Sequence, residues 1–115
     1  LAVARANPDK VQRVLFNLIQ NAIHHTPPDG EVTVRALALP GEIEVQVSDT
    51  GSGIPAPLRD RVFEPFFRAD ASRTDAGAGL GLAIAQAIVE AHGGRIWVAE
   101  PATGASVRFR LPGAV

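Results

Sequence analysis

Apolar side chains follow a helical spacing near the start of this chain. Asn7 is a good helix-capping residue and Pro8 fits the first helical position, so we expect a helix to begin there. The turn-forming residues 26–30 are expected to end it. The apolar stripe of this helix consists of Val11, Val14, Leu15, Leu18 and Ala22.

Four later segments alternate between apolar and polar residues, as strands do. Residues 32–38 and 43–47 flank Pro40 and Gly41, which predicts an antiparallel hairpin. Residues 96–100 and 106–111 predict a second pair of strands. The other expected elements are a short strand at 1–6, a short helix at 58–63 and a helix at 80–92.

Two hairpins and two long helices on separate stretches predict an α+β fold, a two-layer α/β sandwich. A doubly wound sheet would need regular alternation of strands and helices, which this sequence lacks. At 115 residues the chain is long enough for one core, so we expect a single domain over residues 1–115.

Composition removes several classes of function. The net charge of −1 gives no electrostatic reason for binding nucleic acid or anionic lipid. The absence of cysteine excludes disulfides and thiolate sites, and no apolar run reaches the roughly 18 residues that span a bilayer. We see no signal peptide. Because the sequence contains no methionine, we expect it to be a processed piece or a cloned domain.

Asn17 and Asn21 lie four residues apart and therefore share one flank of the first helix. Their carboxamide oxygens suit magnesium when phosphates supply the negative charge. Two ordinary polar residues on a solvated flank remain the alternative. We do not expect the neighbouring His24 and His25 to bind zinc, because adjacent helical residues point about 100° apart. His92, before Gly-Gly, is expected to act as a cation at a helix end.

Asp49 has the same strand parity as Val45 and Val47, so the strand directs its carboxylate toward the buried face. A buried carboxylate needs hydrogen-bond donors. The glycines at 51 and 53 could supply them within an Asx turn. Alternatively, the carboxylate accepts a hydrogen bond from a ligand, and the segment leaves both options open.

Three alternating glycines, Gly77, Gly79 and Gly81, precede the second long helix. They allow backbone to approach a ligand closely, and the helix start supplies free N–H groups for an anion, most often phosphate. Arg68 and Arg73 lie on the polar stretch before them. They either clamp the transferring group or serve as solubility charges on a loop.

Four motifs in order resemble those of the ATP-binding catalytic domain of two-component sensor histidine kinases, in the superfamily of gyrase, MutL and heat-shock chaperone ATPases. Residues 17–22 resemble its N box and residues 49–55 its first glycine box. Residues 63–68 resemble the F box and residues 77–84 the second glycine box. The resemblance covers nearly the whole chain. It implies a mixed, mostly antiparallel sheet covered on one face by helices, with a lid at about 69–78.

The resemblance also implies a site for Mg-ATP. Asp49 would accept a hydrogen bond from the adenine amine, Asn21 with Asn17 would hold Mg²⁺, and Arg68 with Arg73 would be catalytic and reach the γ-phosphate. Ser106 would lie near the base. The expected nucleotide-binding residues are Asn17, Asn21, His24, His25, Asp49, Gly51, Gly53, Ile54, Arg68, Arg73, Gly77, Gly79, Leu80, Gly81, Leu82 and Ser106.

Three positions depart from the family pattern. His24 stands where lysine is common and would bring less charge to a phosphate. His25 stands where tyrosine is common and offers a smaller ring for stacking. Ala102 replaces a glycine, which puts little in doubt. The family also usually has a further strand before the region of Leu1, so we expect the sheet to lack an edge strand in this chain.

The resemblance implies a kinase that passes a γ-phosphoryl group to a histidine on its own phosphoacceptor and dimerisation domain, outside this chain, and through it serves a response regulator. The parent is expected to be a homodimer anchored in the cell membrane. This part would be monomeric and cytoplasmic, without direct contact to membrane or nucleic acid. A gyrase-like ATPase is disfavoured because Asn17 replaces its glutamate base. The alternatives are an anti-sigma serine kinase domain and a nucleotide-free interaction module.

Overall fold

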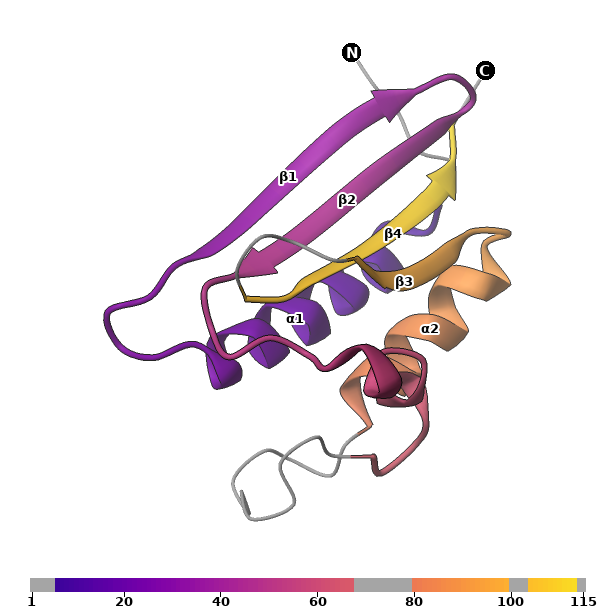
Figure 1. The fold of residues 1–115 in the computed structure, drawn as a ribbon. Helices are drawn as coiled ribbons and strands as arrows, with labels where there is room; N and C mark the ends of the chain where they lie inside the picture. Colours follow the sequence, from indigo (N-terminus) through magenta and orange to yellow (C-terminus); the bar gives the residue numbers. More distant parts are fainter. Residues whose placement is uncertain (1–5, 68–79, 100–103, 114–115) are drawn as a thin grey trace.

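The computed structural model describes residues 6–67, 80–99 and 104–113. Two α-helices lie beneath one face of a sheet, and the opposite face carries no helix of the described part (Figure 1). The expected strand at 1–6 and the lid at 69–78 lie almost entirely outside the described residues. The elements in chain order are α1 (Pro8–His25), β1 (Val32–Leu39), β2 (Glu42–Asp49), η1 (Ala56–Leu58), η2 (Arg61–Phe63), α2 (Gly81–Ala91), β3 (Arg95–Ala99) and β4 (Ser106–Pro112).

The sheet has the strand order β1-β2-β4-β3. All its pairs in the described part are antiparallel, and β2 lies between β1 and β4. Val47 lies opposite Val34 on β1 and Val107 on β4, so these residues share one face. The predicted α+β two-layer sandwich is confirmed.

The core fills the space between the helices and the sheet. Phe109 is fully buried at its centre, because the odd-numbered residues of β4 face the helices. Non-directional burial of this kind supplies most of the stability of a small domain. The other core residues are Val14, Leu18, Ala22, Val47, Val62, Phe63, Leu82, Ala85, Val89, Ile96, Val107 and Leu111.

The face of the sheet away from the helices carries a polar network. Glu44 is 5% exposed and accepts hydrogen bonds from Gln46 and from Arg110, both at 2.7 Å. Arg110 also pairs with Glu42 at 3.3 Å and lies over the ring of Trp97. The hydrogen bond from Gln46, followed by that from Arg110, lowers the pKa of Glu44. The charged and amide groups of this network therefore have one another as partners.

The ends of α1 follow the sequence prediction. The Asn7 side chain accepts hydrogen bonds from the N–H groups of Asp9 and Lys10, and Pro8 takes the first position. Neither α1 nor α2, the two α-helices in the described part, has the length and apolar character needed to cross a bilayer.

The expected helix at 58–63 consists instead of the two short 3₁₀ turns, η1 and η2. The hydrogen bonds of these turns run from Leu58 to Pro55 and from Glu64 to Arg61. Bonds that span three residues close 3₁₀ turns rather than an α-helix.

His92 stands at the C-terminal cap of α2, as expected, and its role as a helix-end cation stays a prediction. Its Nε2 accepts the N–H of Asn7 at 3.2 Å, while its Nδ1 lies 2.8 Å from the carbonyl oxygen of Ile88. These contacts join the end of α2 to the start of α1, which is distant in sequence.

Candidate functional site

Asp49 ends β2 with its side chain on the helix-covered face, as its parity predicts, and is 8% exposed. One oxygen, Oδ1, accepts the N–H groups of Gly51 at 2.9 Å and Ala105 at 3.3 Å. Within the described residues the other oxygen, Oδ2, accepts no hydrogen bond and the carboxylate forms no ion pair. The Asx turn and the capacity to accept from a ligand therefore coexist.

The turn after Asp49 packs against the end of α1. A Cβ atom at Gly51 would collide with the carbonyl oxygen of His25, so only glycine permits this approach. Gly53 has a φ of 81°, which also favours glycine. Ile54 follows and packs against the core. These contacts fix Asp49 beside the C-terminal end of α1.

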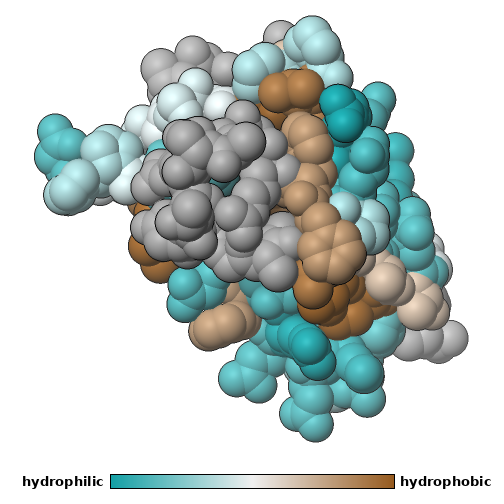
Figure 2. Space-filling view, turned by 90° about the horizontal axis from the view of Figure 1, so that it is seen from below, coloured by the Kyte–Doolittle hydropathy of each residue, from teal (hydrophilic) through white to brown (hydrophobic). Residues whose placement is uncertain are grey.

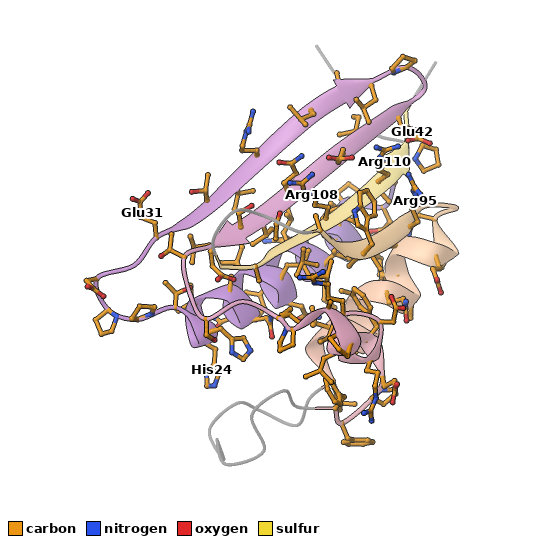
Figure 3. The ribbon with its side chains drawn as sticks, viewed as in Figure 1. His24, Glu31, Glu42, Arg95, Arg108 and Arg110 are labelled. Carbon is orange, nitrogen blue, oxygen red and sulfur yellow. The ribbon has the colours of Figure 1, made fainter. Side chains whose placement is uncertain are left out.

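Asn17 and Asn21 are partly buried and lie one helical turn apart on α1. Asn17 Nδ2 donates to the carbonyl oxygen of Gly81 at 3.3 Å. His24 lies seven residues after Asn17 and therefore extends the same stripe of α1. Its ring meets that of His25 edge to face, with centroids 5.4 Å apart. Figure 3 shows His24 at the end of α1, remote from Arg95, Arg108 and Arg110.

The start of α2 differs from that of α1. Leu80 stands at the cap position and supplies no side-chain hydrogen bond. The N–H groups of the first turn, at Gly81 and Leu82, therefore have no side-chain acceptor in the described part of the chain. Such a helix start attracts an anion.

Ser106 does not join these residues. It lies opposite Ser48, and its hydroxyl is 2.9 Å from the Ser48 hydroxyl and accepts from Arg108 Nε at 3.1 Å. All three side chains lie on the face away from the helices, whereas Asp49 lies on the helical face. Its place in the strand turns the Ser106 side chain away from Asp49, and its expected position near the base stays a prediction.

The residue missed from the sequence is Ala105, which is buried and whose N–H holds Asp49. The alternation of Val107, Phe109 and Leu111 would have placed position 105 on Asp49's face. Arg68, Arg73, Gly77 and Gly79 lie outside the described residues. Within the described residues no group of three His, Asp or Glu side chains could hold a metal ion.

The site is arranged along α1. Gly81 contacts α1 at Asn17, and Gly51 contacts it at His25. Asn21 lies one helical turn, about 6 Å, from each of these contacts. One end thus offers a buried carboxylate for a hydrogen-bond donor and the other offers free N–H groups for an anion. An elongated ligand with a donor at one end and negative charge at the other fits this order.

The family model that describes the histidine kinase-, DNA gyrase B- and HSP90-like ATPases matches residues 6–115. The chain belongs to this ATPase family. The adaptive-response sensory kinase SasA of Synechococcus elongatus is 42% identical over 109 residues, which cover 93% of this chain and 28% of SasA. The chain therefore spans little more than a quarter of that relative's length.

Solved histidine kinase structures share the fold of this ATPase domain. The mycobacterial sensor histidine kinase MprB has a TM-score of 0.88 and 38% identity, over 96% of this chain and 76% of that one. Full-length ShkA in complex with AMPPNP has a TM-score of 0.86 and 35% identity, over 100% of this chain and 24% of ShkA. Within the family, this domain is of the sensor histidine kinase type and binds ATP.

Proposed function

We propose that this chain is the catalytic domain that binds Mg-ATP and donates the γ-phosphoryl group to a histidine on a separate domain of a sensor kinase. The observation that supports this most directly is the carboxylate of Asp49. It is buried and held by two backbone N–H groups at one oxygen, and it keeps the other oxygen for a donor. An adenine amine is such a donor.

The remaining roles follow the order of the site along α1. Asn21 would hold Mg²⁺, which would neutralise the phosphates, and the first turn of α2 would bind the phosphates through N–H groups. His24 and His25, at the end of the same helix, are proposed to border the nucleotide. From the resemblance, we also propose that Arg68 and Arg73 stabilise the charge of the transferring group and that Gly77 and Gly79 approach the phosphates.

The acceptor histidine must come from outside this chain. His92 contacts both α1 and α2, and His24 and His25 lie on the same helix as Asn21, the proposed Mg²⁺ ligand. Figure 2, which views the helical side, shows a band of hydrophobic residues with hydrophilic residues along one side. Exposed apolar surface of this kind supports docking of a partner domain. The same proposal includes a homodimeric parent protein that is anchored in the cell membrane, with this domain in the cytoplasm. The parent would serve a response regulator through its phosphoacceptor domain.

Two other functions remain as outcomes of a test. An anti-sigma serine kinase would share the nucleotide site, and an interaction module would have lost nucleotide. The relatives reported above are named as sensory or histidine kinases, which favours the histidine acceptor.

The test uses the longer protein with its upstream region, incubated with ATP labelled at the γ-phosphate. We expect label on the protein that acid removes and alkali does not, as for phosphohistidine, and no label in the Asp49→Asn variant. Label that survives acid and is lost in alkali would indicate a serine kinase. An absence of both label and ATP binding would indicate an interaction module.

A further inference from the structure

The contact between Asn17 and Gly81 joins the middle of α1 to the first residue of α2. Asn17 Nδ2 donates to the Gly81 carbonyl oxygen at 3.3 Å, and a Cβ at Gly81 would lie 3.8 Å from Asn17 Cβ. The two helices therefore approach closely where the free N–H groups of α2 begin. The hydrogen bond uses the nitrogen of the carboxamide, whereas a metal would bind its oxygen.

A second hydrogen bond joins the start of α1 to the end of α2. The N–H of Asn7 at the start of α1 reaches the ring of His92 at the end of α2. Between the two bonds lie apolar residues such as Val14 and Ala85. Packed apolar side chains restrict sliding of one helix along the other, and hydrogen bonds add a strict geometry. The two polar contacts therefore add a directional restraint on the position of α2 along α1.

We propose that Asn17 is a positioning residue and not a second metal ligand. Its amide group holds the start of α2, and with it the N–H groups of the first turn, at a fixed place relative to Asn21. The inference rests on the proposed nucleotide site and assigns the role of one of its residues. A shift of the helix start would weaken its contact with phosphate whether or not metal is bound.

The test compares Asn17→Ala and Asn21→Ala by calorimetric titration with AMPPNP, with and without MgCl₂. In Asn17→Ala we expect affinity to fall about 3- to 10-fold, the value of one hydrogen bond, by the same factor in both conditions. In Asn21→Ala we expect the gain in affinity on adding MgCl₂ to disappear. The control is Gln20→Ala, an exposed polar residue of α1, which should bind like the unmodified chain.

Asn17→Asp sharpens the distinction, because it keeps the oxygen atoms and loses the N–H donor. A positioning role predicts that its affinity with MgCl₂ stays below that of the unmodified chain. A metal-ligand role predicts affinity with MgCl₂ at or above that of the unmodified chain, together with a lost magnesium effect in Asn17→Ala. That pair of results would overturn the proposal.

Amide NMR spectra give a readout that needs no nucleotide. We expect a nuclear Overhauser contact between the Asn17 side-chain amide and Gly81. In Asn17→Ala the amide signals of Gly81 and Leu82 should shift, while that of Gly51 should not. If the unmodified chain did not bind AMPPNP, the proposed function would be wrong. These spectra would still show whether Asn17 positions the start of α2. Unchanged signals at Gly81 and Leu82 would refute the positioning role.

Discussion

Two buried carboxylates of strand β2 have opposite surroundings. Glu44 faces the open side of the sheet, where Gln46 and Arg110 occupy both of its oxygens. Asp49 faces the helices, where two backbone N–H groups share a single oxygen. Both residues are less than 10% exposed, at 5% and 8%. Burial alone therefore does not distinguish a structural acid from a binding acid.

The partners of each carboxylate make the distinction. An acid whose two oxygens both have partners in the fold stabilises the fold and leaves neither oxygen unpartnered for a ligand. An acid held in place by backbone, with an oxygen to spare, is fixed in position and available. The same alternation of the strand that sends Glu44 to one face sends Asp49 to the other.

The largest effect is expected from Asp49→Asn on nucleotide binding. The amide oxygen can still accept from Gly51 and Ala105, so the melting temperature should change little. The other side-chain position would become a donor facing the adenine amine. A hydrogen bond to a charged group is worth about 1.5–3 kcal/mol, so AMPPNP affinity should fall about 10- to 150-fold by calorimetry. Unaltered affinity would remove Asp49 from the site.

Glu44→Ala should have the reverse profile. Gln46 would lose the acceptor of a buried amide, and we expect a loss of about 1–3 kcal/mol in the free energy of unfolding by urea titration. AMPPNP affinity of the folded protein should not change. The matched control is Glu42→Ala, which removes the other partner of Arg110. Because the Glu42 side chain is 45% exposed, its loss should cost at most about 1 kcal/mol. Equal losses in both variants would contradict the importance of burial.

The pH dependence of stability separates the two acids further. The pKa of Glu44 is lowered in the folded chain from its ordinary value of 4.5 by the bonds from Gln46 and Arg110. The unfolded chain therefore binds a proton first as the pH falls below 4.5. The stabilisation is present above that pH and is lost as the pH falls through the folded-state pKa. Urea titrations should show a steeper loss below pH 4.5 in the unmodified chain than in Glu44→Gln; parallel curves would contradict this.

The smallest effect is expected from Ser106→Ala. Its hydroxyl bonds to Ser48 and Arg108 on the open face, so its removal should cost about 1 kcal/mol of stability or less. Calorimetric titration with AMPPNP should give the affinity of the unmodified chain, because the hydroxyl lies on the other face from Asp49. A large loss of affinity would return Ser106 to the nucleotide site.

Local rules predicted the parts of this fold that local interactions determine. The cap at Asn7 involves neighbours in sequence, and the inward direction of Asp49 follows from strand periodicity. The site residues Asn17, Asn21 and Gly81 came from spacing and from family resemblance, and the structure brings Asn17 and Gly81 together.

Some features needed the structure because distant segments meet, and others because a local signal was not used. The contact of the His92 ring with Asn7 joins residues that lie 85 positions apart in sequence. The direction of Ser106 follows from the alternation of β4, which was not applied to it. Ala105 contributes a backbone N–H, which nearly every residue type has, so its side chain gave no signal of this role.

The 18 residues of α1 contribute to the core, carry Asn17 and Asn21, and contact Gly51. One inserted residue within this helix would rotate everything after it by about 100° relative to everything before it. A single insertion would then disrupt the core contacts and the proposed ligand contacts together. Length variation in relatives should therefore avoid this helix and collect in turns such as residues 27–29, which are exposed.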